Sequence, residues 1–538
     1  PFFEQPLDGY PYKLTDAGTI AKNETDFYLI LPLTRYNAFA RGNYELSDNV
    51  GVFGQALFSS VSTRTVNAPG PITGGWAVNV PYGNQIYTGD AGRGIPSSLN
   101  PDGSTNAAYL AGGRFGLDCP ATGGCATSQV FPVPEELRTL LLSRTDPNAP
   151  FVLNSLLPDP RQTFTDVTTY SLIAGLEGSL PGTDWTWEAF VSHGQSDTFA
   201  QQTGVYSLQR LRAVVTSPNY GYGFEQQGNA ANGGFGASTG TCSTGLNFFT
   251  PPAGGYAEDC LEATRADLKN RSSFRQTIAE ANLQGGLFDL PAGELRFAAG
   301  ASYREMDYQF INDTLTTQGR SFIDQALGIY PSGNAYGYID VKEVYGELLI
   351  PVLSDIPFVE ELTLEIGGRM SDYSTTGTSY TYKALADWRA TDWLRFRGGY
   401  NRAERAPNIG ELFLAAQQTF GTNNRGDVCS RQNPNAFSAN PAVNPNAAQV
   451  EAVCRVLMAQ TGELEAALDY YGTPENPAPQ SPSASGTAFP TLVGNRGLTP
   501  EKADTWTAGV VVQSPVASGP FSRLRFSADW FDIRIDNA

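Results

Sequence analysis

Hydrophobic and polar side chains alternate with a period of two along several long stretches of the chain. Within 294–304, one face of an extended backbone carries Leu295, Phe297, Ala299, Ala301 and Tyr303. The opposite face carries Glu294, Arg296, Ser302 and Arg304. This period is typical of β-strands with one apolar and one polar face. The stretches last about 9 to 15 residues, longer than the usual strand of about 5 to 6, which suits a tilted membrane crossing.

The alternation predicts an all-β chain of about twelve antiparallel strands. They are centred on residues 34–46, 50–65, 166–180, 185–199, 274–290, 294–310, 341–353, 361–374, 379–390, 393–402, 501–514 and 521–535. Short segments rich in turn formers follow alternate strands, at 47–49, 181–184, 291–293, 390–392 and 518–520.

Long connections separate these hairpins, at about 66–165, 204–271, 311–340 and 403–500. A soluble β-sandwich is not expected to have all of its long loops at one end. An outer-membrane β-barrel does, because its periplasmic turns are short and its extracellular loops are long. The whole chain, 1–538, is therefore interpreted as strands of a transmembrane barrel with these four extracellular loops. One short connection near 375–377 departs from the pattern.

Composition narrows the class of protein further. Charged residues make up 17% of the 538 residues, and the net charge is −19, so the electrostatic footprint of a nucleic-acid binder is absent. No run of about 18 apolar residues occurs, which argues against a transmembrane helix but not against spanning strands. Trp185, Trp187, Trp388 and Trp393 lie near expected turns and favour an interfacial girdle; the alternative is that they fill a soluble core.

Two stretches inside the long connections have helical rather than strand spacing. Residues 134–142 begin with proline and two glutamates and continue with leucines, and 447–469 carry apolar side chains at helical intervals. Such spacing is more often local packing than a ligand site, and we interpret both helices as parts of loops.

The six cysteines fall into three local couples: Cys119 with Cys125, Cys242 with Cys260, and Cys429 with Cys454. Metal sites would want tighter spacings, usually with histidines, and this chain has a single histidine. An even count of locally spaced cysteines favours loop disulfides in an oxidising compartment over free buried thiols. We predict a disulfide in each couple, although pairing is not proved by spacing.

Little in the sequence points to catalysis. His193 is the only candidate base for a Ser-His-Asp set. It lies on the same side of its predicted strand as Ala189 and Val191, which is the outward side. Outer-membrane phospholipases have a His-x-Ser pair, and here Ser196 is one position too far along the chain. Among 54 acidic residues some carboxylate pairs are expected in any case. A polar barrel interior explains these acidic residues better than a glycoside hydrolase site does. No phosphate loop or metal-ligand spacing occurs. We expect no enzyme activity, no cofactor and no metal.

Three ordered motifs resemble TonB-dependent outer-membrane receptors. The first is V-Y-G-E-L-L-I-P at 344–351 with the strand at 368–373, and the second is Y-N-R-A-E-R-A-P-N-I-G-E-L-F at 400–413. The third is L-T-P-E-K-A-D-T at 498–505. A weaker pattern extends the resemblance over nearly the whole chain.

The resemblance implies a barrel of about 22 strands closed by a plug, of which about 12 strands are in this chain. It further implies an internal fragment, because the plug, the TonB-contacting segment and the usual C-terminal aromatic strand are not recognised in it. The implied function is TonB-dependent uptake of a scarce ligand across the bacterial outer membrane. The implied partners are the TonB complex of the inner membrane, outer-membrane lipid and the imported ligand, with no nucleic acid.

The residues that match the family motif are Arg405, Ala406, Pro407, Asn408, Glu411, Leu412 and Phe413. Because Pro407 begins the 403–500 connection, we interpret the motif as the anchor of that loop.

The ligand is left open among siderophore, oligosaccharide and cobalamin. Candidate stacking side chains in the loops are Trp76, Tyr82, Tyr87, Tyr220 and Tyr222. Haem is less favoured, since haem importers of the family often carry a histidine just after the motif and this chain does not. The acidic balance also disfavours strong capture of anionic chelates. Two other functions fit the same pattern: a passive porin-like channel and a secreted β-rich carbohydrate-active protein.

Overall fold

The computed structural model of the chain forms two compact units, residues 1–415 with 494–538, and residues 416–493. It describes residues 2–4, 13–15, 28–73, 76–82, 102, 116–117, 127–226, 240–317, 324–419, 421–422, 425–460, 471, 487–488, 490–516 and 518–537.

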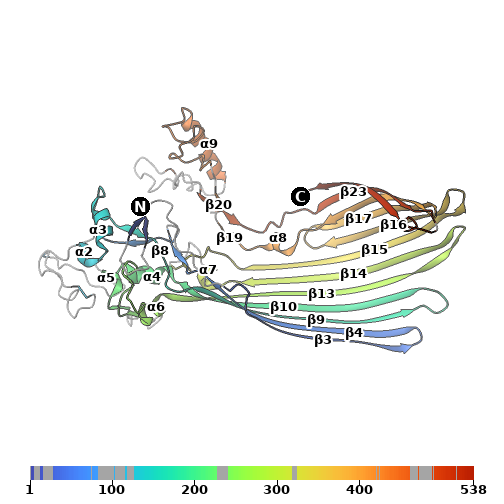
Figure 1. Cartoon of the computed structure of the whole chain (residues 1–538), viewed down its shortest axis with the longest axis horizontal. Coiled ribbons are helices and arrows are strands. Elements are labelled where there is room, and N and C mark those ends of the chain that lie inside the picture. Colours follow the sequence, from blue (N-terminus) through green and yellow to red (C-terminus); the bar gives the residue numbers. More distant parts are fainter. Residues whose placement is uncertain are drawn as a thin grey trace. The chain divides into compact units, whose positions relative to one another are not determined.

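A single antiparallel sheet of twelve strands dominates the first unit (Figure 1). Its strands are β3 (Leu33–Ser47), β4 (Val50–Asn67), β9 (Arg161–Ser179), β10 (Thr186–Tyr206), β13 (Arg265–Leu290), β14 (Gly293–Ile311), β15 (Ala335–Ile356), β16 (Val359–Tyr373), β17 (Gly377–Thr391), β18 (Leu394–Arg405), β23 (Glu501–Gln513) and β24 (Arg525–Asp536). The strands neighbour one another in chain order, so each pairs with the next by a simple up-and-down connection. The prediction of an all-β, antiparallel chain with about twelve strands is confirmed.

Several strands are longer than the alternation predicted. β13 begins at Arg265 rather than near 274, and β15 begins at Ala335 rather than near 341. The start of β13 carries polar side chains on both faces, so no period of two marks it. At the start of β15, Ala335, Gly337 and Ile339 share one face and Tyr336 and Tyr338 the other, so the two faces are not divided into apolar and polar. In both strands the backbone ladder continues through these ends. The long connections are correspondingly shorter, at 68–160, 207–264, 312–334 and 406–500. The turn expected at 518–520 is a longer connection, 514–524.

The two faces of the sheet differ in chemistry. Cross-strand register places small and apolar side chains together on one face, which we call the apolar face: Leu176, Ala189, Ala281, Ala301, Val344, Met370 and Ala384. The other face, which we call the polar face, carries Glu188, Asn282, Ser302, Glu343, Ser371 and Lys383. Although apolar, the first face is open: Val191 is 54% exposed and Val344 is 49% exposed.

Aromatic side chains border the apolar face. Trp388 and Phe396 stack 5.1 Å apart near the 392–393 turn, and Tyr400 and Trp506 lie 4.8 Å apart nearer the other end of their strands. Trp388 and Trp393 are 37% and 41% exposed, so they do not fill a soluble core.

The first three long connections build a second hydrophobic core, which we call the loop core. Its elements are β5 (Pro71–Ile72), β6 (Val78–Val80), α2 (Thr127–Val130), α3 (Glu135–Leu142), β7 (Phe151–Leu153), β8 (Ser155–Leu156), α4 (Leu208–Val215), α5 (Pro218–Gly221), β11 (Phe224–Gln226), β12 (Gly240–Cys242) and α6 (Glu258–Thr264). The helix predicted at 134–142 is confirmed as α3. Fully buried side chains include Phe131, Tyr206, Leu211 and Leu246.

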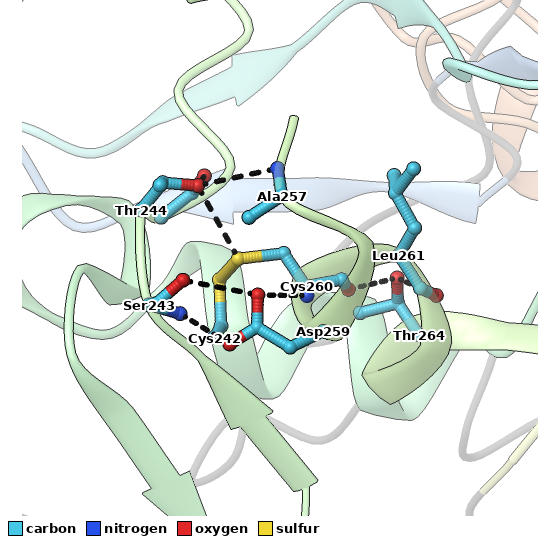
Figure 2. The surroundings of a disulfide bond; sticks show 9 residues. Cys242, Ser243, Thr244, Ala257, Asp259, Cys260, Leu261 and Thr264 are labelled. Carbon is cyan, nitrogen blue, oxygen red and sulfur yellow. Dashed lines mark hydrogen bonds between the residues drawn. A yellow bond between two sulfur atoms is a disulfide. The ribbon is translucent and has the colours of Figure 1, made fainter. Parts of the chain in front are cut away.

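The predicted disulfide between Cys242 and Cys260 is formed and links β12 to α6 (Figure 2). Both cysteines are fully buried in the loop core. Beside them, the Asp259 carboxylate accepts hydrogen bonds from the backbone and hydroxyl of Ser243, at 2.8 and 3.1 Å. Side-chain contacts therefore support the covalent link.

The second unit, 416–493, contains α9 (Ala447–Gln460) and four short strands, β19 (Gln417–Gln418), β20 (Gly421–Thr422), β21 (Thr487–Ala488) and β22 (Thr491–Leu492). The helix expected over 447–469 is present to Gln460, and 461–469 lie outside the described residues. The predicted Cys429–Cys454 disulfide is formed and ties the preceding loop to α9. The couple Cys119 and Cys125 lies outside the described residues.

Four short elements complete the description: β1 (Phe2–Glu4) pairs with β2 (Lys13–Thr15), α7 (Thr314–Thr317) follows β14, and α8 (Ile409–Phe413) follows β18.

Candidate functional site

The family-like motif forms a clamp at the end of β18. Nε of Arg405 donates to Glu501 at 2.9 Å, and its two terminal nitrogens each donate to Glu411 at 3.1 Å. Glu501 is the first residue of β23, whereas Glu411 belongs to α8. One guanidinium therefore joins the two ends of the 406–500 connection, and Arg rather than Lys suits this place because its fork contacts both carboxylates.

A capping box shapes the short helix α8. The Asn408 side chain accepts a hydrogen bond from the Glu411 backbone at 2.9 Å, and the Glu411 carboxylate accepts one from the Asn408 backbone at 2.8 Å. The hydrogen bonds from Arg405 and from this backbone amide lower the pKa of Glu411 below its usual range. The carboxylate is thereby kept ionised, as the clamp requires.

The apolar side of α8 packs against the polar face of β15. Leu412 is 1% exposed and belongs to a small core with Ile339 and Val341, and Ile409 and Phe413 border that core. Gly337 of β15 leaves room for them, since a Cβ there would lie 2.8 Å from Ile409 and 2.7 Å from Phe413. These contacts agree with the anchoring role expected of the motif, in which Pro407 is also buried and Ala406 half-buried.

Three of the aromatic residues suggested for ligand stacking are buried in the loop core. Trp76, Tyr82 and Tyr220 are 8%, 1% and 0% exposed. A ligand would reach them only after the loop core opened. The sequence carried a sign of this burial, because Trp76, Val78, Val80 and Tyr82 alternate and so share one face of a short extended segment.

Tyr222 is 41% exposed and retains an accessible ring. It follows three residues with positive φ, Asn219, Tyr220 and Gly221, a backbone conformation that side-chain-bearing residues adopt at a cost. Tyr87 lies outside the described residues.

Sequence reasoning missed a polar network where the loop core meets the strands. Arg265, at the start of β13, donates to Asp159 at 2.6 and 2.9 Å, and the Tyr206 hydroxyl donates to the same carboxylate at 2.5 Å. Burial of Asp159 opposes its ionisation, but these donors outweigh it and lower its pKa. The partners are 47 and 106 residues away in the chain, so no local pattern could reveal the network.

The polar face carries its own hydrogen-bonded network. Glu343 is 9% exposed and accepts hydrogen bonds from Ser371 at 2.6 Å and Ser302 at 3.1 Å. The Arg369 guanidinium lies 3.8 Å from Glu343 and over the ring of Tyr345. Nearer the turns, a cavity of about 470 Å³ is lined on this face by Leu349, Glu365, Asp387, Arg397 and Phe531, among others.

Within the described part of the chain, no three His, Cys, Asp or Glu side chains are arranged to hold a metal ion. No described helix is long and apolar enough to cross a membrane. His193 lies on the apolar face of β10, where its ring nitrogens are 3.4 Å from the Tyr170 hydroxyl and 3.0 Å from the Thr277 hydroxyl.

Solved structures resemble this fold over most of the chain. The siderophore receptor PirA from Acinetobacter baumannii is 12% identical with a TM-score of 0.36, and the match covers 94% of this chain and 48% of that one. A mutant of the ferric enterobactin receptor PfeA from Pseudomonas aeruginosa is 10% identical with a TM-score of 0.39, covering 94% and 42%.

Among curated proteins, the heme/hemopexin utilization protein C of Haemophilus influenzae (strain 86-028NP) is 35% identical over 107 residues, 18% of this chain and 14% of that protein. The chain thus spans a small part of that relative, and about half or less of the two solved structures. The model of the family described as TonB dependent receptor-like, beta-barrel matches residues 138–538, which is well over half of the sequence. The chain therefore belongs to this family of receptors.

Proposed function

We propose that the protein takes part in TonB-dependent uptake of a scarce ligand across the bacterial outer membrane. The observation that carries this proposal is the division of the sheet into an exposed apolar face and a charged polar face, in a chain of this receptor family. The apolar face would contact lipid, and the polar face would line the interior of a barrel.

The distribution of ion pairs supports this orientation. Lys383 pairs with Glu347, Arg397 with Asp529, and Arg369 lies near Glu343, all on the polar face. In the bilayer core, a charge on the lipid side would be costly, whereas charges inside a barrel meet water or one another. The four long connections would then lie outside the cell and the short turns in the periplasm.

A direct test of this orientation is to insert an epitope tag at one of two sites in the full-length protein. A tag after Asn440, in the 406–500 connection, should be detected by antibody on intact cells. A tag in the turn at 181–184 should be detected only after the outer membrane is opened. The reverse result would refute the orientation.

For the ligand, we propose a siderophore, an oligosaccharide or a corrinoid of the cobalamin class. On the polar face, Lys383, Arg397 and Arg405 are each paired with a carboxylate. These paired cations provide no focused positive field that would attract a strongly anionic chelate. The curated relative is named for haem and hemopexin utilization, so haem is a second candidate. Against it stands the position of His193 on the apolar face, away from any passage along the polar face.

The decisive experiment measures uptake of radiolabelled ligands from each class, and of haem, by the source bacterium starved for them. Deletion of the gene should abolish uptake of one ligand, and so should deletion of TonB. Uptake that persists without TonB would instead favour a passive porin-like channel. Recovery of the folded full-length protein in the soluble secreted fraction would favour the secreted carbohydrate-active protein.

A further inference from the structure

Three glycines on the polar face each lie beneath a contact between the two strands that flank them. They are Gly300 of β14, Gly367 of β16 and Gly509 of β23. In each case the register places one residue of either neighbouring strand directly beside the glycine. Because glycine has no Cβ, the two flanking side chains meet above it. We call each such arrangement a glycine clasp.

The first glycine clasp joins β15 to β13 across Gly300. The Tyr345 hydroxyl donates to the side-chain oxygen of Asn282, and also to Glu280 at 3.1 Å. A Cβ on Gly300 would lie 2.5 Å from both Asn282 Oδ1 and the Tyr345 hydroxyl oxygen. Such an approach is far inside van der Waals contact, so any other residue here would displace the tyrosine.

The second glycine clasp joins β17 to β15 across Gly367. Nζ of Lys383 lies 3.1 Å from the Glu347 carboxylate and also pairs with Glu365 on the middle strand. A Cβ on Gly367 would lie 3.0 Å from Glu347 Cγ and 3.1 Å from Lys383 Cε. The aliphatic stems of both charged side chains therefore rest on the glycine itself.

The third glycine clasp joins β18 to β24 across Gly509. Arg397 and Asp529 form a two-point ion pair, with N–O distances of 2.9 and 2.8 Å. A Cβ on Gly509 would meet the Asp529 carboxylate and would lie 3.2 Å from Arg397 Cγ. The paired side chains differ among the three clasps, but in each one they meet above a glycine of the strand between them.

We propose that the three glycine clasps hold long polar side chains flat along the polar face and keep them out of the space in front of it. Neighbouring strands are about 4.8 Å apart, so side chains that bridge two strand spacings must lie along the sheet rather than stand away from it. Each clasp also pairs the polar groups laterally. The polar face is thereby smoothed, and Lys383 and Arg397 are each paired with a carboxylate. This inference rests on geometry alone and does not depend on the proposed uptake.

The chain offers a matched pair of variants at adjacent positions of β16. Gly367→Ala adds a methyl group under the second glycine clasp, whereas Gly368→Ala adds one on the apolar face, where the nearest atom, the Thr381 carbonyl oxygen, is 3.8 Å away. Both variants lose similar backbone freedom in the unfolded chain, so their difference isolates the clasp.

The measurement is the rate at which Lys383 of the full-length protein in detergent reacts with a water-soluble succinimidyl ester, followed by peptide mass spectrometry. Lys383 is 26% exposed and paired with two carboxylates, so it should react slowly. In Gly367→Ala the rate should rise about fivefold, the factor that corresponds to losing roughly 1 kcal/mol of ion pairing. An equal rise in Gly368→Ala, or no rise in Gly367→Ala, would overturn the proposal.

A second measurement protects the test if Gly367→Ala fails to fold. Arg397→Ala, Asp529→Ala and the double variant are compared by the midpoint of heat unfolding in detergent. If the third glycine clasp exists, the double variant should lower the midpoint no more than either single variant. Additive shifts would show that the two side chains act independently and would refute the clasp.

Discussion

The sheet and the loop core use hydrophobic side chains in opposite ways. In the loop core, Leu211, Phe131 and Tyr206 are fully buried, as in a water-soluble domain. In the sheet, Val191 and Val344 are about half exposed, and the buried or half-buried groups include charged side chains such as Glu343 and Lys383. One chain thus places its hydrophobic side chains in two ways, as expected if the sheet contacts lipid and the loop core contacts water.

The two regions also satisfy the hydrogen bonds of their polar groups in different ways. The sheet satisfies its backbone through ladders between strands and its side chains through lateral pairs on one face. The loop core combines a buried hydrophobic cluster and a disulfide with long-range polar contacts, such as Arg265 with Asp159. Perturbation of the loop core should therefore be local and severe, whereas the sheet should lose stability in smaller steps. Five experiments test this contrast.

The largest effect is expected from Leu211→Asp in α4. Leu211 is 0% exposed, and the substitution would bury an unpaired carboxylate, at a cost of about 4 kcal/mol or more. The loop core should lose protection from hydrogen exchange over 207–226 and 240–264 while the strands stay protected. Loss of protection in β14 and β16 as well would show that the two regions fold as one.

The matched substitution in the sheet is Val191→Arg on the apolar face. Val191 is 54% exposed, so little protein packing is lost, but a lipid-facing arginine should cost about 2–4 kcal/mol near the bilayer midplane. Unfolding in lipid vesicles should show this loss, and the loop core should keep its protection. A neutral result in lipid would mean that this face does not contact hydrocarbon.

Removal of the Cys242–Cys260 disulfide should have a comparable, local effect. The link closes a separation of 18 residues, for which chain entropy predicts about 3 kcal/mol. The double variant Cys242→Ser with Cys260→Ser should therefore loosen the loop core and leave the sheet intact. Cys242 and Cys260 are both fully buried, whereas in the other link Cys454 is buried but Cys429 is half-buried. A mild reductant should therefore cleave Cys429–Cys454 first, which peptide mapping of alkylated thiols would reveal.

A smaller effect is expected from Arg405→Lys in the clamp. Lysine keeps the charge but cannot contact Glu411 and Glu501 through a planar fork. Amide exchange in α8 should become faster, while the ladder between β17 and β18 should be unchanged. Equal exchange in the variant and the parent would mean that the capping box and Leu412 suffice to hold α8.

The last effect is confined to alkaline pH, where unit 416–493 should lose stability. Burial, with the nearby Glu451 and Asp427 carboxylates, raises the pKa of Tyr471 to about 12. A raised pKa stabilises the folded state below the unfolded value of about 10, and this contribution disappears as the pH rises from about 10 to about 12. Ultraviolet titration of Tyr471→Phe against the parent would identify the transition, and the variant should lack it.

The sequence predicted the sheet well because a strand's period of two is a local property. The alternation around Leu295–Tyr303 and the turn formers at 291–293 locate β14 and its turn with β13 within a few residues. The motif is interpreted as an anchor because Pro407 begins the long connection; the capping box between Asn408 and Glu411, which the structure shows, is also a local feature. Local disulfide couples were predicted for the same reason.

Tertiary structure alone decided what depends on distant partners. Whether Trp76 or Tyr220 is exposed depends on packing among three separate connections, and the sequence interpretation of both as ligand-facing does not fit their burial. The Asp159–Arg265 contact joins residues 106 apart, and the glycine clasps require the register of three strands at once. The amino-acid sequence by itself determined the strands, their turns and their two faces, because these follow from neighbouring residues, whereas the loop core, its polar network and the clasps exist only once register and long-range packing bring their parts together.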